Sequence, residues 1–187
     1  MSQTEHFTGK GAVLLRTKTC GQLRGEDVEQ SVTVCGWVDS RRDHGGLVFI
    51  DLRDRYGKVQ VVIDPTQGQS LHDLAGAVRN EDVLRVTGRV VRRAEKDVNP
   101  KLATGEIDIR ANVLEVLNKS RVVPFEPGTT TPPNEELRLK YRFLDLRRPR
   151  LQELMLFRHR LTKLVRDYFD RHGFLDEQRP VRGQGSA

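Results

Sequence analysis

The chain has 187 residues, of which 36% are hydrophobic and 31% are charged, and its formal net charge is +6. This length allows one domain, or one domain and part of another. The hydrophobic share suffices for a globular core and excludes a wholly disordered chain. The modest positive excess favours a polyanionic partner, although it is also typical of a well-solvated surface.

Cysteine usage and hydropathy indicate where the protein works. Cys20 and Cys35 are the only cysteines, and neither lies in a CxxC motif, so we expect no zinc site and no disulfide framework. No run approaches 18 consecutive apolar residues, and the first residues do not resemble a targeting signal. We therefore expect a cytoplasmic protein with no membrane span and no bound metal, preceded by a disordered tail over residues 1–14.

Short strands separated by turn residues are predicted in the first two thirds of the chain. In chain order they cover residues 32–38, 47–53, 58–63, 83–92 and 106–117. The turn Asp54-Arg55-Tyr56-Gly57 makes the second and third strands a hairpin, and Gly88 in the fourth indicates a bulge or a close approach of two backbones. Ser70 can begin a short helix that reaches about Arg79. This order favours a mainly β fold, a five-stranded barrel of the oligonucleotide-binding type (OB-fold).

A break and a helix follow the barrel. Prolines, Gly128 and three threonines gather within residues 124–133, which no helix or central strand would tolerate, so we predict a hinge or linker over residues 119–148. Pro149 can begin a helix and Gly173 can end one, and apolar residues recur between them at helical spacing. We expect a long amphipathic helix there. Residues 137–172 have a net charge of +7, since eleven Lys and Arg stand against four Asp and Glu.

Alternation of side chains separates the predicted hairpin into two faces. If Ile50 and its alternate neighbours point into the barrel, Phe49 lies outside, and the same pattern puts Gln60 on that outer face. Bases of single-stranded RNA stack on exposed rings at about 1–3 kcal/mol each, an amide can read a base edge, and the pair Arg41-Arg42 can hold phosphates. The alternative is that Phe49 only covers an end of the barrel or packs on another domain.

Other candidate sites are weaker. Several polar side chains could be imagined as a metal or acid–base cluster, but acidic residues are common beside turns, and we interpret these as structural: Asp43, His44, Asp51, Asp54 and Asp64. Glycine-rich phosphate loops are absent. We interpret Arg147-Arg148-Pro149-Arg150 as solvated surface, with contact to an RNA phosphate or a carboxylate as the alternative. No catalytic residue is predicted.

Several segments of the sequence resemble the amino-terminal region of bacterial-type aspartyl-tRNA synthetases. The resemblance runs from about Leu15 to Asp176 and is carried by Cys20-Gly21-Gln22-Leu23-Arg24, by residues 35–55 and above all by Leu137–Pro149. It implies an OB-fold anticodon-binding domain over residues 15–118, a hinge over 119–148 and the truncated start of an α/β class II catalytic domain over 149–187. Complete members of that family are homodimers that charge aspartate onto tRNA with ATP and Mg²⁺.

The resemblance also implies roles for single residues. Residues at the positions of Arg42, Phe49 and Gln60 contact anticodon bases in that family: the Phe stacks on the central uracil, the Gln hydrogen-bonds to it, and the Arg contacts the neighbouring base and the backbone. Three more residues match positions that approach the first anticodon base, namely Arg93, Asn99 and Asp108. His44 lies where members that charge both aspartate and asparagine tRNAs carry His. The companion loop, residues 95–97, departs from those members, so the choice of tRNA stays open.

The carboxyl end departs from the family. Pro180 occupies the place of the motif 1 proline, but Glu177-Gln178-Arg179 breaks the expected pattern, and the ATP-binding arginines of motifs 2 and 3 do not occur in the sequence. The resemblance therefore implies that this chain, by itself, binds tRNA without charging it and uses no cofactor. Two other classes stay open: a free-standing OB-fold RNA-binding module and an OB-fold protein-interaction module.

Overall fold

A computed structural model describes residues 15–129 and 131–177. The chain divides into two units at Val123 and Pro124, a boundary that lies inside the predicted hinge. The tail expected over residues 1–14 and the motif 1 proline, Pro180, lie outside the described residues. The two units are described one at a time below.

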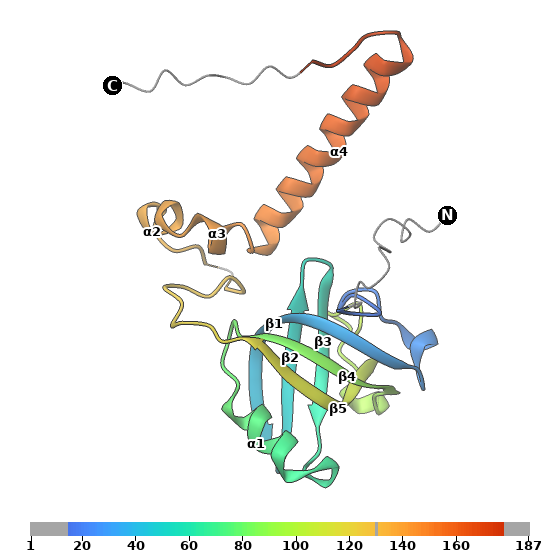
Figure 1. Cartoon of the computed structure of the whole chain (residues 1–187), viewed down its shortest axis with the longest axis vertical. Helices are drawn as coiled ribbons and strands as arrows, with labels where there is room; N and C mark the ends of the chain where they lie inside the picture. Colours follow the sequence, from blue (N-terminus) through green and yellow to red (C-terminus); the bar gives the residue numbers. More distant parts are fainter. Residues whose placement is uncertain (1–14, 130, 178–187) are drawn as a thin grey trace. The chain divides into compact units, whose positions relative to one another are not determined.

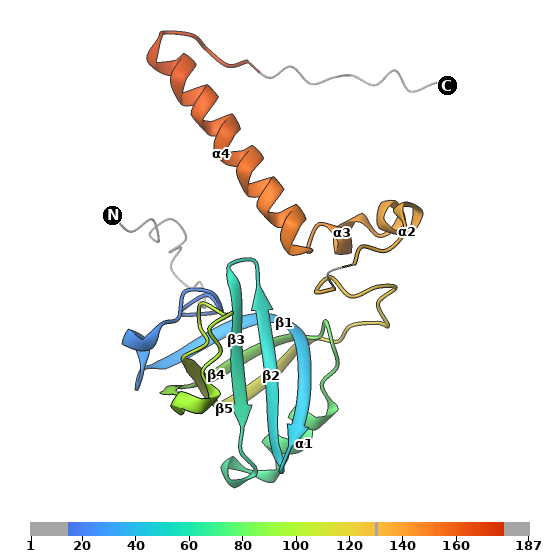
Figure 2. The same ribbon diagram turned by 180° about the vertical axis from the view of Figure 1, so that it is seen from behind.

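The first unit is a closed barrel of five strands, which confirms the OB-fold prediction (Figures 1 and 2). The strands are β1 (Ser31–His44), β2 (Leu47–Asp54), β3 (Gly57–Ile63), β4 (Val83–Arg92) and β5 (Ile107–Asn118). Around the barrel they follow the order β1-β2-β3-β5-β4, and every pairing is antiparallel except β3 with β5. Short 3₁₀ turns lie at Gly25–Asp27, Pro65–Gln67 and Glu95–Asp97.

Alternate side chains of every strand fill the barrel, as the period of two requires. Ile50 and Val61 are fully buried, and they pair directly across β2 and β3. The other buried apolar side chains of that hairpin are Val48, Leu52, Val59 and Ile63. Each buried aliphatic side chain stabilises the fold by about 1.5–3 kcal/mol. The prediction of which hairpin residues point inward is confirmed.

Two glycine positions determine the local geometry of the barrel. Gly45 and Gly46 join β1 to β2 with φ of 63° and 83°, the left-handed pair that a two-residue hairpin turn of type I′ needs. Gly88 lies where β4 crosses β5 so closely that a Cβ atom would come within 2.2 Å of the Arg110 carbonyl oxygen. The β4–β5 register also shifts beside Gly88, which confirms the predicted bulge and close approach.

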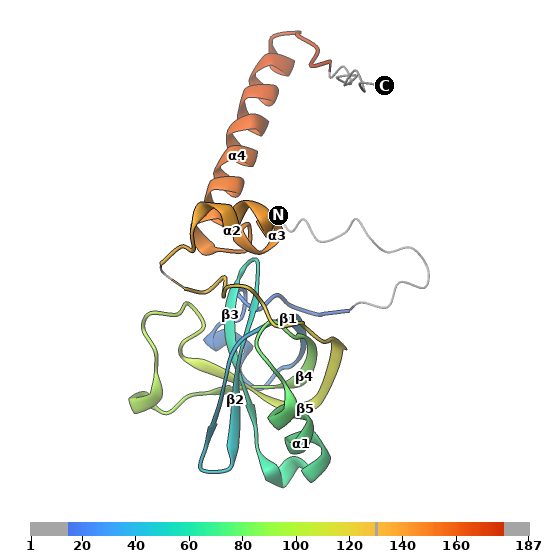
Figure 3. The same ribbon diagram turned by 90° about the vertical axis from the view of Figure 1, so that its left-hand side faces the viewer.

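Helix α1 (Gln69–Ala77) differs at both ends from the prediction of Ser70 to Arg79. Gly68, not Ser70, is the N-cap residue. At the other end Val78 is already extended, and the Arg79 backbone N–H donates to the Asp82 carboxylate at 2.9 Å instead of continuing the helix. Figure 3 shows α1 at the end of the barrel that holds the β1–β2 turn, opposite the β2–β3 turn.

The second unit contains the predicted long helix, α4 (Pro149–Arg171), which begins at a proline and is followed by Gly173 at φ 80°. Eight of its apolar side chains are 45–64% exposed in this unit: Leu154, Met155, Phe157, Leu161, Leu164, Val165, Tyr168 and Phe169. No helix within the described ranges is long and apolar enough to span a membrane. Two short helices, α2 (Glu135–Lys140) and α3 (Arg142–Asp145), lie inside the range expected as linker.

A buried carboxylate organises those short helices. The Asp145 side chain is fully buried and accepts from Arg142 Nη1 at 2.6 Å and from Arg138 Nε at 3.1 Å. Arg148 Nη1 lies 3.7 Å from the same carboxylate, and the Arg148 side chain is only 12% exposed. The interpretation of the Arg147–Arg150 cluster as solvated surface is therefore wrong for Arg148, which contacts a carboxylate.

Candidate nucleic-acid interface

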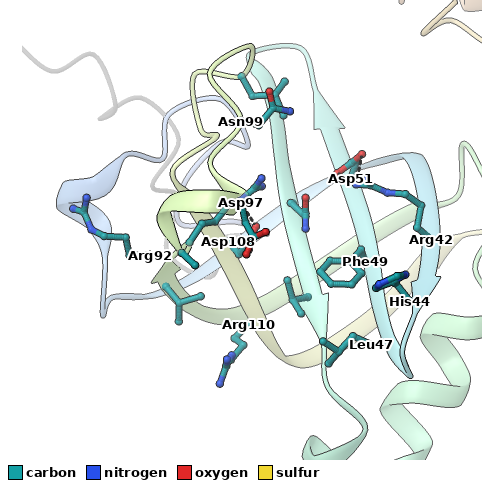
Figure 4. Close-up of a pocket in the computed structure, with 16 residues that line it drawn as sticks. Arg42, His44, Leu47, Phe49, Asp51, Arg92, Asp97, Asn99, Asp108 and Arg110 are labelled. Atoms are coloured by element: carbon teal, nitrogen blue, oxygen red, sulfur yellow. Dashed lines mark hydrogen bonds and ion pairs between the residues drawn. The ribbon is translucent and has the colours of Figure 1, made fainter.

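An open groove of about 700 Å³ lies on the outer face of the barrel (Figure 4). All five strands and the loop between β4 and β5 contribute to it. All six side chains that the sequence analysis selected line the groove: Arg42, Phe49, Gln60, Arg93, Asn99 and Asp108. The structure therefore brings together residues that are up to 66 positions apart in the sequence.

Strand register puts the aromatic ring at the centre of this face. Phe49 pairs with Arg42 on β1 and with Val62 on β3, while Gln60 pairs with Asp51, so Phe49 and Gln60 are diagonal neighbours on adjacent strands. Diagonal side chains on one face of a sheet lie about 7–8 Å apart or less, within reach of one base. A half-buried ring beside an amide can stack a base and read its edge at once.

Arg42 is held beside this ring by a carboxylate. Its Nη2 donates to the two Asp51 oxygens at 3.2 and 3.3 Å, and Ser40 Oγ donates to Asp51 Oδ2 at 2.7 Å. The Arg42 side chain is 59% exposed. Exposed ion pairs contribute only about 0–1 kcal/mol, so a phosphate can replace Asp51 as the partner of the guanidinium at little cost.

Arg93 and Asp108 form a second, more buried pair. Arg93 Nε donates to Asp108 Oδ1 at 2.8 Å and to the Ile107 carbonyl at 3.1 Å, and the two side chains are only 6% and 15% exposed. Burial raises the pKa of Asp108 above its ordinary value, and the neighbouring Arg93 charge only partly opposes this. Arg93 Nη2 is a buried donor without a partner among the described residues. Arg93 therefore mainly holds Asp108 in place.

Asn99 lies at one end of the groove, on the loop between β4 and β5. Its backbone N–H donates to the Gly105 carbonyl at 3.0 Å, and its side-chain oxygen accepts from the Lys101 N–H at 3.1 Å. Thr104 Oγ1 donates to the Lys58 carbonyl at 2.6 Å, which ties the loop to the start of β3. These bonds hold the Asn99 amide at the rim of the groove.

The groove also contains residues that sequence reasoning did not select. Its apolar lining comes from Leu47, Val62, Val91 and Leu102, and its further charged lining from Arg92, Asp97 and Arg110. Arg110 follows Asp108 by two positions on β5, so strand alternation could have found it. Leu47 and Val62 likewise lie two positions from Phe49 and Gln60 on their strands, whereas the others come from the loop or from the end of β4, where alternation gives no direction.

The imagined metal or acid–base cluster is not assembled. The buried Asp54 carboxylate accepts from the Cys20, Tyr56 and Gly57 backbone N–H groups, and Asp64 accepts from the Thr66 N–H. Asp51 and His44 line the groove. Across the part of the chain that the structure describes, no three His, Cys, Asp or Glu side chains gather closely enough to hold a metal ion.

Two family models match the chain. Residues 32–117 match the OB-fold nucleic acid binding domain, and residues 134–185 match the tRNA synthetases of class II (D, K and N). The first range covers nearly all of the barrel strands and every residue that lines the groove. The second begins at the residue that caps α2.

Curated relatives cover almost the whole chain. The aspartate–tRNA(Asp/Asn) ligase of Rhodopirellula baltica is 52% identical over 92% of this chain and 29% of its own length. That of Salinibacter ruber is 52% identical over 89% of this chain and 27% of its own length. The chain thus spans less than a third of the length of these relatives.

Solved structures share the fold. The asparaginyl-tRNA synthetase of Pyrococcus horikoshii, complexed with asparaginyl-adenylate, matches 88% of this chain and 36% of its own, with a TM-score of 0.73 and 23% identity. The aspartyl-tRNA synthetase of Entamoeba histolytica matches 84% of this chain and 38% of its own, with a TM-score of 0.75 and 17% identity. At these identities the likeness supports the fold alone.

Proposed function

We propose that this chain, a homologue of the aspartate–tRNA ligases along nearly its whole length, binds a tRNA anticodon in the groove of its barrel. The observation that carries the proposal is the placement of Phe49, Gln60 and Arg42 on one exposed face, with direct register between Phe49 and Arg42. A ring, an amide and a cation are the three groups needed to stack, read and hold one nucleotide.

We assign the following roles, as the resemblance implies. The central anticodon base stacks on Phe49 and hydrogen-bonds to the Gln60 amide, and Arg42 exchanges Asp51 for the adjacent phosphate. Asp108, held by Arg93, accepts N–H groups of the first anticodon base, and Asn99 closes that end of the groove. A carboxylate that accepts from a base discriminates strongly, because a base without the N–H leaves it unpaired and desolvated.

We extend the proposal to the complete protein. Charging of aspartate onto tRNA, with ATP and Mg²⁺ as cofactors in the cytoplasm, is proposed for a complete ligase and not for this chain alone. Because the relatives are named for both aspartate and asparagine tRNAs, we propose that the groove accepts both. His44 lines the groove, and we assign it to the third anticodon base, where the groove would accept either tRNA.

Binding of anticodon stem-loops tests the proposal. Phe49→Ala should weaken binding of an aspartate-anticodon stem-loop by about 1–3 kcal/mol, because the stacked base loses its ring. Gln60→Ala should relax the preference for uracil at the central position. Val113→Ala is the matched control, since Val113 is an exposed apolar residue of β5 outside the groove, and it should bind as the wild type does.

The measurement is fluorescence anisotropy of labelled stem-loops at two salt concentrations, which separates phosphate attraction from base reading. Equal binding of stem-loops with altered anticodons by the wild type would contradict anticodon recognition and favour a general RNA-binding module. Absence of affinity for any tRNA would favour a protein-interaction module instead.

A further inference from the structure

The turn between β2 and β3 presents an exposed aromatic ring among arginines. Tyr56 is 51% exposed, and the guanidinium carbons of Arg55 and Arg16 lie 4.9 and 5.9 Å from the centre of its ring. Arg24 lies in the adjacent segment, where its Nη1 donates to the Gly21 carbonyl at 2.8 Å. We call Arg16, Arg24, Arg55 and Tyr56 the hairpin-tip patch.

The backbone beneath this patch is rigid. Gly21 packs on the turn so tightly that a Cβ atom would lie 1.9 Å from the Tyr56 carbonyl oxygen. Asp54, buried under the turn, accepts from the Tyr56 and Gly57 N–H groups at 2.7 and 3.1 Å. A turn fixed in this way presents its side chains at little further cost in conformational entropy.

The patch has an excess of positive charge. Asp54 is the carboxylate nearest to Arg16, at 3.7 Å, but it is buried and already occupied by backbone donors. Arg55 is exposed and forms no ion pair with any carboxylate of the described residues. By contrast, Arg42 and Arg93 of the groove each have an acidic partner. The patch can therefore attract phosphate.

The patch adjoins the groove at its Asn99 end. Figure 4 shows Asn99 beside the β2–β3 turn, and the Thr104–Lys58 hydrogen bond ties the Asn99 loop to the first residues of β3. A strand of RNA that passes Asn99 on leaving the groove therefore meets the turn next. An aromatic ring between guanidinium groups suits a ribose–phosphate backbone with a stacked base, because the ring takes the base and the cations take the phosphates.

We propose that the hairpin-tip patch is a second RNA contact, which binds the ribose–phosphate backbone of the RNA that continues beyond the groove. It rests on the proposed function of the groove, because the groove sets where the RNA leaves. The patch contributes affinity without sequence preference, since none of its groups is placed to read a base edge. It lengthens the footprint of the barrel on a tRNA beyond the anticodon.

Two RNA probes separate this proposal from that of the groove. The short probe is the linear anticodon trinucleotide, which fills the groove only, and the long probe is the whole anticodon stem-loop. Tyr56→Ala and Arg55→Gln should each weaken the long probe, by about two- to fivefold for Tyr56→Ala, and leave the short probe unchanged. Arg55→Gln should also lower the slope of log affinity against log salt by about 0.7–0.9, as the loss of one phosphate contact requires.

Arg79→Gln is the matched control, because Arg79 is an exposed arginine that follows α1 and belongs to neither the groove nor the hairpin-tip patch. It should leave both probes and the salt slope unchanged. If the tip variants bind both probes as the wild type does, or weaken the two probes equally, the second contact is refuted while the groove stands. If the wild type binds the two probes with the same affinity and salt slope, the patch likewise contributes nothing. Failure of wild type to bind either probe overturns both proposals.

Discussion

Gly88 allows a sharp test of how the barrel holds its groove together. A methyl group at Gly88 would lie 2.2 Å from the Arg110 carbonyl oxygen and 2.8 Å from Ile109 Cγ2, where no real contact is possible. Gly88→Ala therefore forces β4 and β5 apart. Overpacking of this kind costs about 1–3 kcal/mol, and each kcal/mol lowers the melting temperature of a domain of this size by about 4–8 °C.

The displaced strand also carries the groove. Arg110 and Asp108 lie on β5 close to Ala111, the residue that pairs with Gly88. The variant should therefore bind the anticodon stem-loop more weakly even at temperatures where it is folded. Circular dichroism melts give the stability, and anisotropy below the transition gives the affinity. The two measurements together distinguish a shifted strand from a merely less stable barrel.

Gly76 provides the matched control. It lies in α1, and an added Cβ would meet nothing within 4 Å. Gly76→Ala should therefore stabilise the barrel by up to about 1 kcal/mol, since alanine is the better helix former. A Gly88→Ala variant that melts at the wild-type temperature, or a Gly76→Ala variant that loses as much stability as Gly88→Ala, would refute the reasoning.

Two further predictions concern buried carboxylates. The pKa of Asp108 is raised in the folded state, so the wild type should lose stability relative to Asp108→Asn as the pH rises from about 4, the ordinary pKa of an aspartate. Urea unfolding of both proteins between about pH 4 and pH 7 measures this difference in stability. A difference that changes with pH in the opposite direction would contradict the raised pKa. Asp145→Ala leaves three arginines without their shared buried partner, so the segment of α3 should lose protection from hydrogen exchange by about 3–5 kcal/mol. Asp167→Ala, which removes an exposed partner of Lys163 on α4, is its control and should change protection by less than about 0.5 kcal/mol; equal effects of the two changes would count against a structural role for Asp145.

Local pattern was enough to predict the barrel and the centre of its groove. The range of β4 was predicted without error, and alternation alone put Phe49 and Gln60 on one outer face. Gly88 was recognised because a glycine inside a strand of branched residues needs a reason, and the crossing with β5 provides it.

Features that depend on distant contacts were not predicted. The strand β1 continues to His44, well beyond the predicted Val38, because a bulge at Asp39 lets it follow β2 to the Gly45-Gly46 turn. The helices α2 and α3 in the predicted linker rest on local contacts that the analysis did not use, since Asp145 gathers arginines from both sides and the Asn134 side chain caps α2. By alternation Arg53 shares the outer face with Phe49, but its ion pairs with Asp39 and Glu81 bury its side chain.

The parallel pairing of β3 with β5 closes the barrel over only two residue pairs, Val61 with Ile109 and Val62 with Arg110. This is the narrowest seam of the barrel, and the groove spans it, since Gln60 lies on one side and Asp108 on the other. An anticodon whose central base bonds to Gln60 and whose first base bonds to Asp108 would hold the two strands together from outside. Occupancy of the groove should therefore raise the unfolding free energy of the barrel as RT ln(1 + [L]/Kd), so that a matched anticodon would be reported by the melting temperature of the protein itself.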